Sequence, residues 1–185
     1  RLRFPGTDPQ VIVVRGKAYE PLMADATRQG QVVPVDVNLD PAVVKSRQIE
    51  IVKTESAGVR LDDASVVVGG GRGLGGPEPF EQLEELARLL GGAVGASRAV
   101  CDAGWLDHGY QIGLTGKTIT PDLYIMVGIS GASQHMAGCS GAKHLIAINK
   151  DADSNIFKAA SLGVVGDWKT VLPSFIETVR ELVKS

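Results

Sequence analysis

The residues of this sequence that could do chemistry lie in glycine-rich turns between short apolar segments. Seventeen of the 23 glycines fall between Gly69 and Gly141, and glycine lets a backbone turn sharply or approach a ligand closely. The turn GGGRGLGG from Gly69 to Gly76 precedes a predicted helix whose N-terminal amides could bind an anion, and Arg72 could contact a phosphate. Its spacing is neither that of a P-loop nor G-x-G-x-x-G, so a tight turn is the alternative interpretation.

A second turn, GISGASQH, runs from Gly128 to His135 after the apolar segment YIMV. Ser130 could cap the helix predicted to follow, or its hydroxyl and the free amides around it could hold a pyrophosphate. His135 would lie one turn into that helix. An isolated histidine usually fills a surface or core position, but beside an anion-binding turn it becomes a candidate hydrogen-bond donor.

The segment QIGLTGK, from Gln111 to Lys117, is predicted to form a loop that exposes backbone amides and the Thr115 hydroxyl. Such a loop suits hydrogen bonding to the edge of a planar heterocycle, and an ordinary surface turn is the alternative. Lys117 could complete a phosphate site. The spacing of a Walker A motif is missing, so the sequence does not predict nucleotide hydrolysis.

Two further polar groups follow apolar segments, Asn149 to Asp151 after LIAI and Asp167 after GVV. Each could contact a nucleoside sugar or base edge, and each could equally cap a helix or form a turn. Five predicted strands therefore end in polar or glycine-rich residues. The sequence places no catalytic triad, carboxylate pair or metal cluster among them, which favours binding over catalysis.

From Ser65 onward, short strands alternate with helices, a pattern typical of a parallel sheet flanked by helices in an α/β fold. In such sheets ligands bind beyond the carboxyl ends of the strands. One helix is predicted from Pro79 to Leu90, with Gly91 as its stop, and another from Pro173 to Val183, with Pro173 in its first position and Phe175, Val179 and Leu182 on one face. The predicted strands are Val66 to Val68, Ala93 to Gly95, Leu123 to Val127, Leu145 to Asn149 and Val164 to Val165.

Residues 1–60 read as part of another unit, with strand candidates at Val11 to Val14, Val32 to Val37 and Arg47 to Lys53 separated by proline and glycine. We expect residues 61–185 to form a separate binding domain. The boundary is expected between Ala57 and Asp63.

The composition excludes several classes of function. A formal net charge of −2 and the lack of a basic run disfavour nucleic-acid partners. No apolar run approaches the roughly 20 residues of a membrane span, and the N-terminus lacks signal-peptide order, so we expect the cytoplasm or an organelle matrix. Cys101 and Cys139 form no C-x-x-C pair and are expected to be small core or near-site residues.

Six motifs in order, GGRGL, GASRAV.DAG, Q.G.TGK..TPDLY, GISGA.QH.AG, IAINKD and G.VGD, resemble the alpha subunit of electron transfer flavoproteins over residues 66–185. The resemblance implies a Rossmann-like/DHS-like domain that binds FAD in extended form, with a beta subunit as partner. It implies that residues 1–60 are the remainder of an N-terminal α/β domain. It also implies a carrier that accepts electrons from flavoprotein dehydrogenases, such as acyl-CoA dehydrogenases, and passes them to a quinone-linked or other redox acceptor. The matrix of mitochondria would be its compartment in a eukaryote, and the cytoplasm in a prokaryote.

The same resemblance implies roles for individual residues of this sequence. Thr115 would hydrogen-bond near flavin N5, Arg98 would lie against the isoalloxazine ring, and His135 would donate toward O2. Because reduced flavin carries negative charge on its N1 to O2 side, Arg98 and His135 would favour the reduced forms. The implied contacts are Arg72 and Ser97 with the phosphate and ribityl region; Ser130, Gly131, Ala132, Ser133, Gln134 and His135 with the pyrophosphate and pyrimidine side; Ile112, Gly113, Leu114 and Thr115 with the flavin edge; and Asn149, Asp167 and Trp168 with the adenosine.

This chain departs from the family pattern at two positions. Leu114 stands where many relatives carry glutamine, so only backbone contacts carry over there, and Ser133 replaces a commoner apolar residue. Two rival interpretations remain from the residues: a flavin- or nicotinamide-dependent oxidoreductase with its own substrate, and a nucleotide-binding structural module without redox function.

Overall fold

A computed structural model divides the chain into two compact units, Arg1–Glu55 and Ser56–Ser185. The structure describes Gly6, Val11, Val13, Tyr19, residues 22–47, Ile49, Glu50 and residues 59–184. In the first unit, one 3-10 helix, η1, spans Pro41–Val43. The strand predicted from Val32 to Val37 was wrong: these residues form no strand and their side chains are exposed, since a strand without a hydrogen-bonded neighbour is not stable.

The other two strand candidates of the first unit, Val11 to Val14 and Arg47 to Lys53, lie partly outside the described residues. That residues 1–60 are the remainder of an N-terminal domain stays a prediction. No helix in the described part of the chain is long and apolar enough to cross a membrane.

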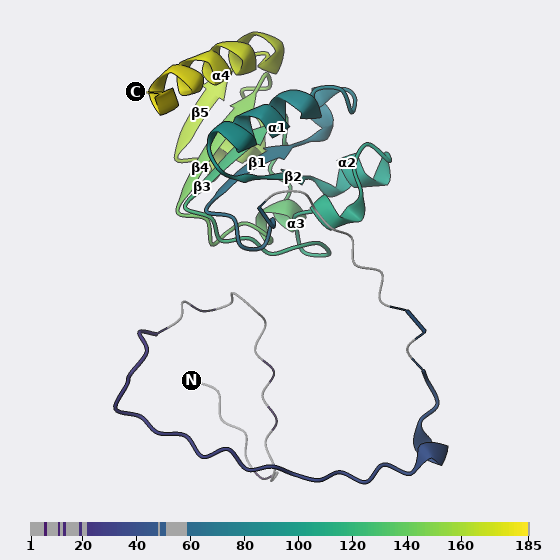
Figure 1. Cartoon of the computed structure of the whole chain (residues 1–185). Helices are drawn as coiled ribbons and strands as arrows, with labels where there is room; N and C mark the ends of the chain where they lie inside the picture. The colour runs from purple at the N-terminus through teal and green to yellow at the C-terminus, as the bar shows by residue number, and fades with distance from the viewer. Residues whose placement is uncertain are drawn as a thin grey trace. The chain divides into compact units, whose positions relative to one another are not determined.

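The second unit is built on a five-stranded parallel sheet (Figure 1). Every neighbouring pair of strands runs parallel, so the predicted α/β fold is confirmed. The order β2-β1-β3-β4-β5 places β2 and β3 on opposite sides of β1, so the chain reverses its direction across the sheet between β1 and β3. The strands are β1 (Val66–Gly70), β2 (Ala93–Ala96), β3 (Leu123–Val127), β4 (His144–Asn149) and β5 (Leu162–Val165).

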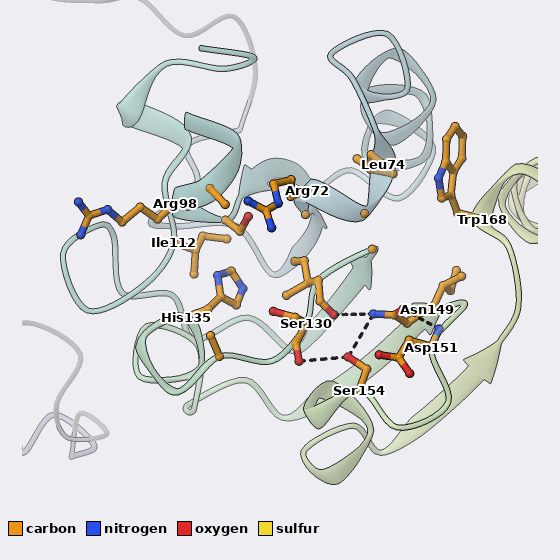
Figure 2. A pocket seen from close by; sticks show the side chains of 18 of the residues that line it. Arg72, Leu74, Arg98, Ile112, Ser130, His135, Asn149, Asp151, Ser154 and Trp168 are labelled. Atoms are coloured by element: carbon orange, nitrogen blue, oxygen red, sulfur yellow. Dashed lines mark hydrogen bonds between the residues drawn. The ribbon is translucent and has the colours of Figure 1, made fainter. Parts of the chain in front are cut away.

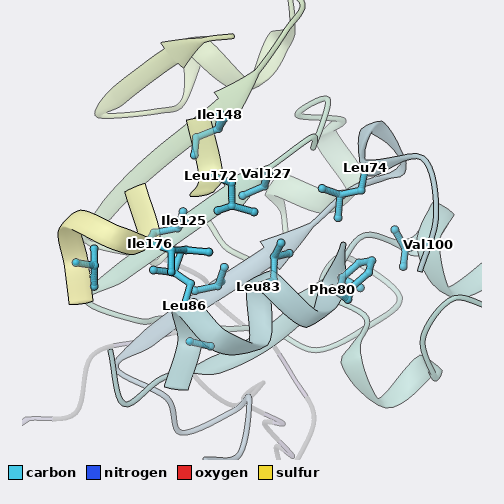
Figure 3. Packing of buried hydrophobic residues seen from close by; sticks show 14 of the residues in the cluster. Leu74, Phe80, Leu83, Leu86, Val100, Ile125, Val127, Ile148, Leu172 and Ile176 are labelled. Carbon is cyan, nitrogen blue, oxygen red and sulfur yellow. The ribbon is translucent and has the colours of Figure 1, made fainter. Parts of the chain in front are cut away.

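Helices α1 (Phe80–Leu89) and α4 (Trp168–Lys184) cover one face of this sheet (Figures 1 and 3). The apolar stripe predicted for α1 is confirmed, because Phe80, Leu83, Leu86 and Ala87 are buried. They form one core cluster with Val68, Ile125, Val127 and Ile148 of the sheet and Leu172 and Ile176 of α4. Gly91 has a φ of +62° and follows α1 as the predicted stop.

The opposite face is covered by α3 (Ser133–Met136), the 3-10 helix η4 (Asn155–Lys158) and connecting loops. Val67, Tyr124, Met126 and Ala147 of the sheet pack there with Cys139 and Ile156. Central strands buried on both faces are apolar throughout, which explains why β1 and β3 read as continuous apolar runs. Cys101 and Cys139 are free and buried, as expected.

The last helix differs from its prediction at its start and in its buried face. It begins at Trp168 because the Asp167 carboxylate accepts a hydrogen bond from Lys169 N at 3.0 Å, and Pro173 lies inside it. The buried side chains are Leu172, Ile176 and Val179, whereas Leu182 is exposed. The rule that proline favours the first position of a helix placed the start five residues too late.

Short helices follow each of the first three strands. They are η2 (Arg72–Leu74) after β1, α2 (Arg98–Asp102) after β2 and α3 after β3, with η3 (His108–Tyr110) between α2 and β3. The turns after β1 and β3 meet backbone to backbone, because Gly71 N donates to Val127 O at 2.9 Å and Gly73 N to Gly128 O at 3.0 Å. These elements form the rim at which the carboxyl ends of the strands meet.

Candidate functional site

A cavity of about 910 Å³ lies at the carboxyl ends of the strands (Figure 2). Residues that follow all five strands line it, and its centre lies where the chain direction reverses between β1 and β3, the usual ligand position in open α/β sheets. The expected site residues that line it are Arg72, Ser97, Arg98, Ile112, Gly113, Leu114, Thr115, Ser130, Ala132, Gln134, His135, Asn149, Asp167 and Trp168.

Three of the candidate residues lie outside the cavity lining. Lys117 does not line the cavity and instead pairs with Asp62 at 3.3 Å. Gly131 and Ser133 do not line it either. Gly131 turns the chain, with a φ of +78° and the backbone of Ile156 in the space a Cβ would fill, and the Ser133 hydroxyl donates to Gln134 Oε1 at 3.3 Å.

The turn after β1 presents Arg72 and backbone to the cavity, but not the N-terminus of α1. The chain first forms η2, and α1 begins only at Phe80, outside the cavity lining. The N-terminus of the helix predicted to follow GGGRGLGG therefore lies outside the cavity lining, and the η2 turn takes its place there. Arg72 makes no ion pair with any described residue, so its guanidinium is available to an anionic group in the cavity.

Ser130 does not cap α3. The N-cap is Ala132, without a side-chain hydrogen bond. The Ser130 carbonyl accepts from Ile156 N and from Ser154 Oγ, both at 3.1 Å, so the backbone of this turn is fixed from the neighbouring loop. Its hydroxyl is left free at the cavity surface.

His135 is buried against Tyr124 of β3, with 3.0 Å between Tyr124 Oη and His135 Nε2. Burial lowers the pKa of His135 from 6.5 to about 4, with the Ile112 backbone acting weakly in the opposite direction, so the ring is neutral near pH 7. Burial also raises the pKa of Tyr124 well above its ordinary value. Gly69 makes room for this contact, because a Cβ there would lie 2.3 Å from Tyr124 Oη.

The hydrogen bond to Tyr124 determines which ring nitrogen of His135 carries the proton. The Tyr124 hydroxyl is fully buried and its one hydrogen bond runs to Nε2. A buried O–H without an acceptor is costly, so Tyr124 donates and the proton of the neutral ring lies on Nδ1. That Nδ1 is shielded from solvent and has no hydrogen-bond partner in the described protein, so the ring would have to turn to present this donor to a ligand.

Lowering the pH should destabilise the protein through His135. The unfolded chain binds a proton at about pH 6.5 and the folded chain only near pH 4. The unfolded state therefore holds more protons between these values, and the free energy of unfolding falls as the pH drops through this window, by about 3 kcal/mol in total. Urea unfolding at a series of pH values measures it. His135→Gln, which can still bond Tyr124, should lack this part of the pH dependence; an identical profile would contradict the buried neutral histidine.

Ser97, Arg98 and the 112–115 loop form the side of the cavity next to β2. The Ser97 side chain makes no capping hydrogen bond, and Arg98 pairs with Asp102 at 3.2 Å while 66% of its side chain is exposed. Leu114 is exposed, and its backbone N donates to Gln134 O at 2.7 Å. The loop is therefore attached to the turn that carries His135.

Asn149, Asp167 and Trp168 form the other end of the cavity, beyond β4 and β5. Asn149 is held in its turn, donating to Ile129 O at 3.0 Å and accepting from Asp151 N at 3.0 Å, and Asp167 caps α4. Asn149 therefore acts as a turn residue and Asp167 as a helix cap, the alternative roles considered from the sequence. These roles also fix the two side chains in place at the cavity wall.

Sequence reasoning missed several residues that build the site. Tyr124 read as one apolar position of a strand, and only its pairing with His135 gives it a role. Asp102 lies four residues after Arg98, the spacing of an ion pair along a helix, but no helix was predicted there. Ser154 carried no signal: it comes from a loop and reaches Asn149 and Ser130 through tertiary contacts.

These residues fit an extended nucleotide cofactor. Arg72 and the free Ser97 and Ser130 hydroxyls supply groups for phosphates, Nδ1 of His135 supplies an unpaired donor, and the lining continues to Trp168. The described residues hold no cluster of three or more histidine, cysteine or acidic side chains that could bind a metal ion. An open parallel sheet with such a cavity at its switch point defines a dinucleotide-binding α/β domain.

Comparison with known proteins gives the family. Residues 60–140 match the family model of the electron transfer flavoprotein FAD-binding domain. The chain is 44% identical over 181 residues to the electron transfer flavoprotein subunit alpha of Thermoanaerobacterium thermosaccharolyticum, covering 98% of this chain and 55% of that protein. It is 45% identical over 181 residues to that of Bacillus subtilis, covering 97% and 55%, and 39% identical over 185 residues to the mitochondrial one of Arabidopsis thaliana, covering 97% and 51%.

The chain belongs to the family of electron transfer flavoprotein alpha subunits, and FAD is the cofactor of its C-terminal domain. The resemblance inferred from the six motifs is thereby confirmed. The chain spans about half the length of these relatives.

Proposed function

We propose that the chain acts as the FAD-holding part of an electron carrier, which receives electrons from flavoprotein dehydrogenases such as acyl-CoA dehydrogenases and passes them to a quinone-linked or other redox acceptor. A beta subunit of the same kind of flavoprotein is the proposed partner. The compartment would be the cytoplasm of a prokaryote or the mitochondrial matrix of a eukaryote; the names of the Arabidopsis and Dictyostelium relatives call those two proteins mitochondrial.

The observation that carries this proposal is that every acidic side chain lining the cavity already makes an ion pair or accepts a hydrogen bond within the protein. Asp102 pairs with Arg98, Asp151 accepts from Asp153 N at 3.1 Å, and Asp167 caps α4. The buried histidine has a pKa of about 4, too low for a general base that works near neutral pH. A dehydrogenase or oxidase with its own substrate would need an acid or base free to move a substrate proton, so these residues favour a carrier.

The cofactor supplies one- and two-electron chemistry when bound, and the chain's own residues would set how easily it accepts electrons. Arg98 would place a cation beside the ring, and His135 would donate a hydrogen bond from Nδ1. Fixed donors and charges of this kind favour the more negative form of a bound group. We further propose that Arg72, Ser97 and Ser130 hold the phosphate and ribityl region and that Asn149, Asp167 and Trp168 hold the adenosine.

Steady-state assays separate the carrier from its alternatives. The FAD-loaded chain, together with its partner subunit, should show no sustained turnover of small organic substrates with oxygen or nicotinamide, but should transfer electrons once a reduced flavoprotein dehydrogenase and an acceptor are both supplied. Sustained turnover without a second redox protein would support the oxidoreductase interpretation. Bound flavin that no reductant reduces would support the structural-module interpretation.

A further inference from the structure

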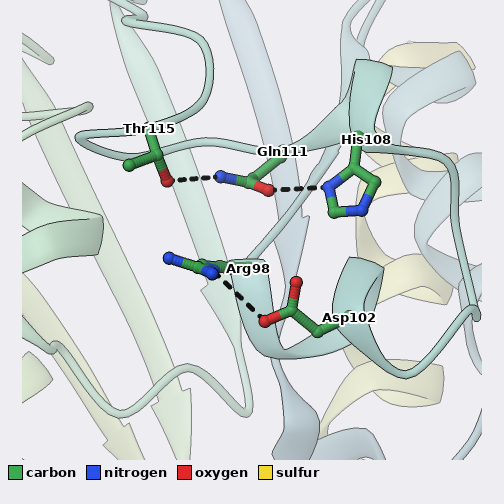
Figure 4. Close-up of polar contacts among 5 residues, drawn as sticks. All are labelled: Arg98, Asp102, His108, Gln111 and Thr115. Atoms are coloured by element: carbon green, nitrogen blue, oxygen red, sulfur yellow. Dashed lines mark hydrogen bonds and ion pairs between the residues drawn. The ribbon is translucent and has the colours of Figure 1, made fainter.

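A chain of hydrogen bonds joins the protein surface to Thr115 at the cavity wall (Figure 4). His108 of η3 lies 2.9 Å from Gln111, between its ring Nδ1 and the amide Oε1. The Gln111 amide Nε2 then donates to Thr115 Oγ1 at 3.0 Å. His108 and Thr115 are exposed, whereas Gln111 is only 4% exposed, so a buried amide connects the two.

The backbone holds Gln111 rigidly in this position. Its N donates to His108 O at 3.1 Å, and its carbonyl accepts from Lys117 N at 2.7 Å. The loop closes over it at Gly116, where a Cβ would lie 2.4 Å from Gln111 O and 2.9 Å from Gln111 Cγ. The buried side chain is held by its two hydrogen bonds, and the alternative arrangement that keeps the amide in place is a half-turn that exchanges its oxygen and nitrogen.

The direction of the amide decides what Thr115 can offer to a ligand. In the arrangement of the structure, His108 donates to Oε1 and Nε2 donates to Thr115, so the Thr115 hydrogen is left free to point into the cavity. In the reversed arrangement, Thr115 would donate to Oε1 and would present only lone pairs to the cavity. A hydrogen-bond donor is what an unprotonated ring nitrogen of an oxidised flavin requires.

We propose that Gln111 is a positioning residue that turns the Thr115 hydroxyl into a hydrogen-bond donor toward the flavin, and that His108 fixes the direction of the Gln111 amide through its Nδ1–H. This inference rests on the proposed function and on the flavin contact of Thr115 that the family resemblance implies. Neither Gln111 nor His108 needs to touch the reacting part of the cofactor for it to hold.

A double-mutant cycle on the full chain, with its partner subunit, tests the proposal through FAD affinity and midpoint potential. Thr115→Val should raise the FAD dissociation constant roughly 2- to 10-fold, the worth of one net hydrogen bond. It should also raise the two-electron midpoint potential, because a donor to a nitrogen that becomes protonated on reduction favours the oxidised form. Gln111→Met should act in the same direction. The double variant should match Thr115→Val alone, because Gln111 acts through Thr115. Independent, additive effects would overturn the proposal.

His108 lies at the exposed end of the hydrogen-bond chain, so a variant at this position should fold normally. Its ring also provides a measurement that needs no cofactor. His108→Ala should weaken FAD binding in the same direction as Gln111→Met but less strongly, since the amide keeps Thr115 as one partner. In the apo chain, at a pH where the imidazole is neutral, the ¹⁵N resonances of His108 should show the hydrogen on Nδ1. A hydrogen on Nε2 alone would mean that the amide is reversed and would overturn the proposal, whether or not FAD binds.

Discussion

Gly71→Ala is expected to destabilise the C-terminal domain by about 3 kcal/mol and to weaken FAD binding strongly. A Cβ at Gly71 would lie 2.2 Å from Gly128 O and 2.6 Å from Gly128 C. Both atoms belong to the backbone and cannot swing away, so the turns after β1 and β3 must separate. Inserting atoms into a closely packed site typically costs about 1–3 kcal/mol, and here the displaced turns also form the cavity wall.

Gly76→Ala is the matched control for this variant. A Cβ at Gly76 would meet chiefly Glu78 Oε2, at 2.5 Å, and that carboxylate ends a flexible side chain that can move aside. We expect its free energy of unfolding and its FAD affinity to stay near those of the unmodified chain. Urea unfolding of the apo proteins and FAD titration compare the two variants, and equal behaviour of Gly71→Ala and Gly76→Ala would refute the close contact between the turns.

Arg98→Ala is expected to lower the one-electron potential of the bound flavin by tens of millivolts. A guanidinium beside the ring stabilises the reduced, more negative form, and a partly buried charge is worth about 1–3 kcal/mol, whereas an exposed one is worth almost nothing. The Arg98 side chain is 66% exposed in the cofactor-free chain, so the full effect requires the flavin itself to cover it. Arg98→Lys should restore only part of the potential, because an ammonium cannot lie flat on the ring.

Removing the negative charge of Asp102 should shift the flavin potential in the opposite direction to removing the positive charge of Arg98. Asp102 lies 3.2 Å from Arg98 on α2, and its negative charge offsets that of the guanidinium at the cavity wall. Asp102→Asn should therefore raise the potential while leaving Arg98 in place. Spectroelectrochemical titration of the three variants decides the matter: an unchanged or raised potential in Arg98→Ala would show that Arg98 is a surface residue or serves a phosphate only.

The strands and the first long helix could be predicted because their signals are local. An apolar run that ends before a glycine predicted both ends of β3 correctly. The apolar stripe from Phe80 to Ala87 predicted the buried face of α1. The strand predicted at Val32 to Val37 failed because β-branched residues form a strand only when a neighbour pairs with them. The start of α4 failed because the Asp167 cap outweighed the preference of Pro173 for a first position.

Which residues line the site was more predictable than which hydrogen bonds connect them. Residues after five strands could be grouped from the rule that ligands bind at the carboxyl ends, and most of them line one cavity. The roles of Tyr124, Gln111 and Ser154 depend on contacts across 4 to 24 residues of sequence. The contacts of Tyr124 and Ser154 join residues too far apart for a local pattern to encode, and the Gln111 contact lies in a loop without helical periodicity. These contacts determine which hydrogens the site presents to a ligand.

The most direct test of this account is a titration of the cofactor-free chain with FAD, alone and with its partner subunit, followed by flavin absorption and by tryptophan fluorescence. Because the cavity reaches from Arg98 to Trp168, we predict saturable binding of one FAD per chain, competition by ADP, weaker binding of FMN, and quenching that is largely lost in Trp168→Phe. A chain that takes up no FAD under either condition, or that binds FMN as tightly as FAD with ADP unable to compete, would contradict it.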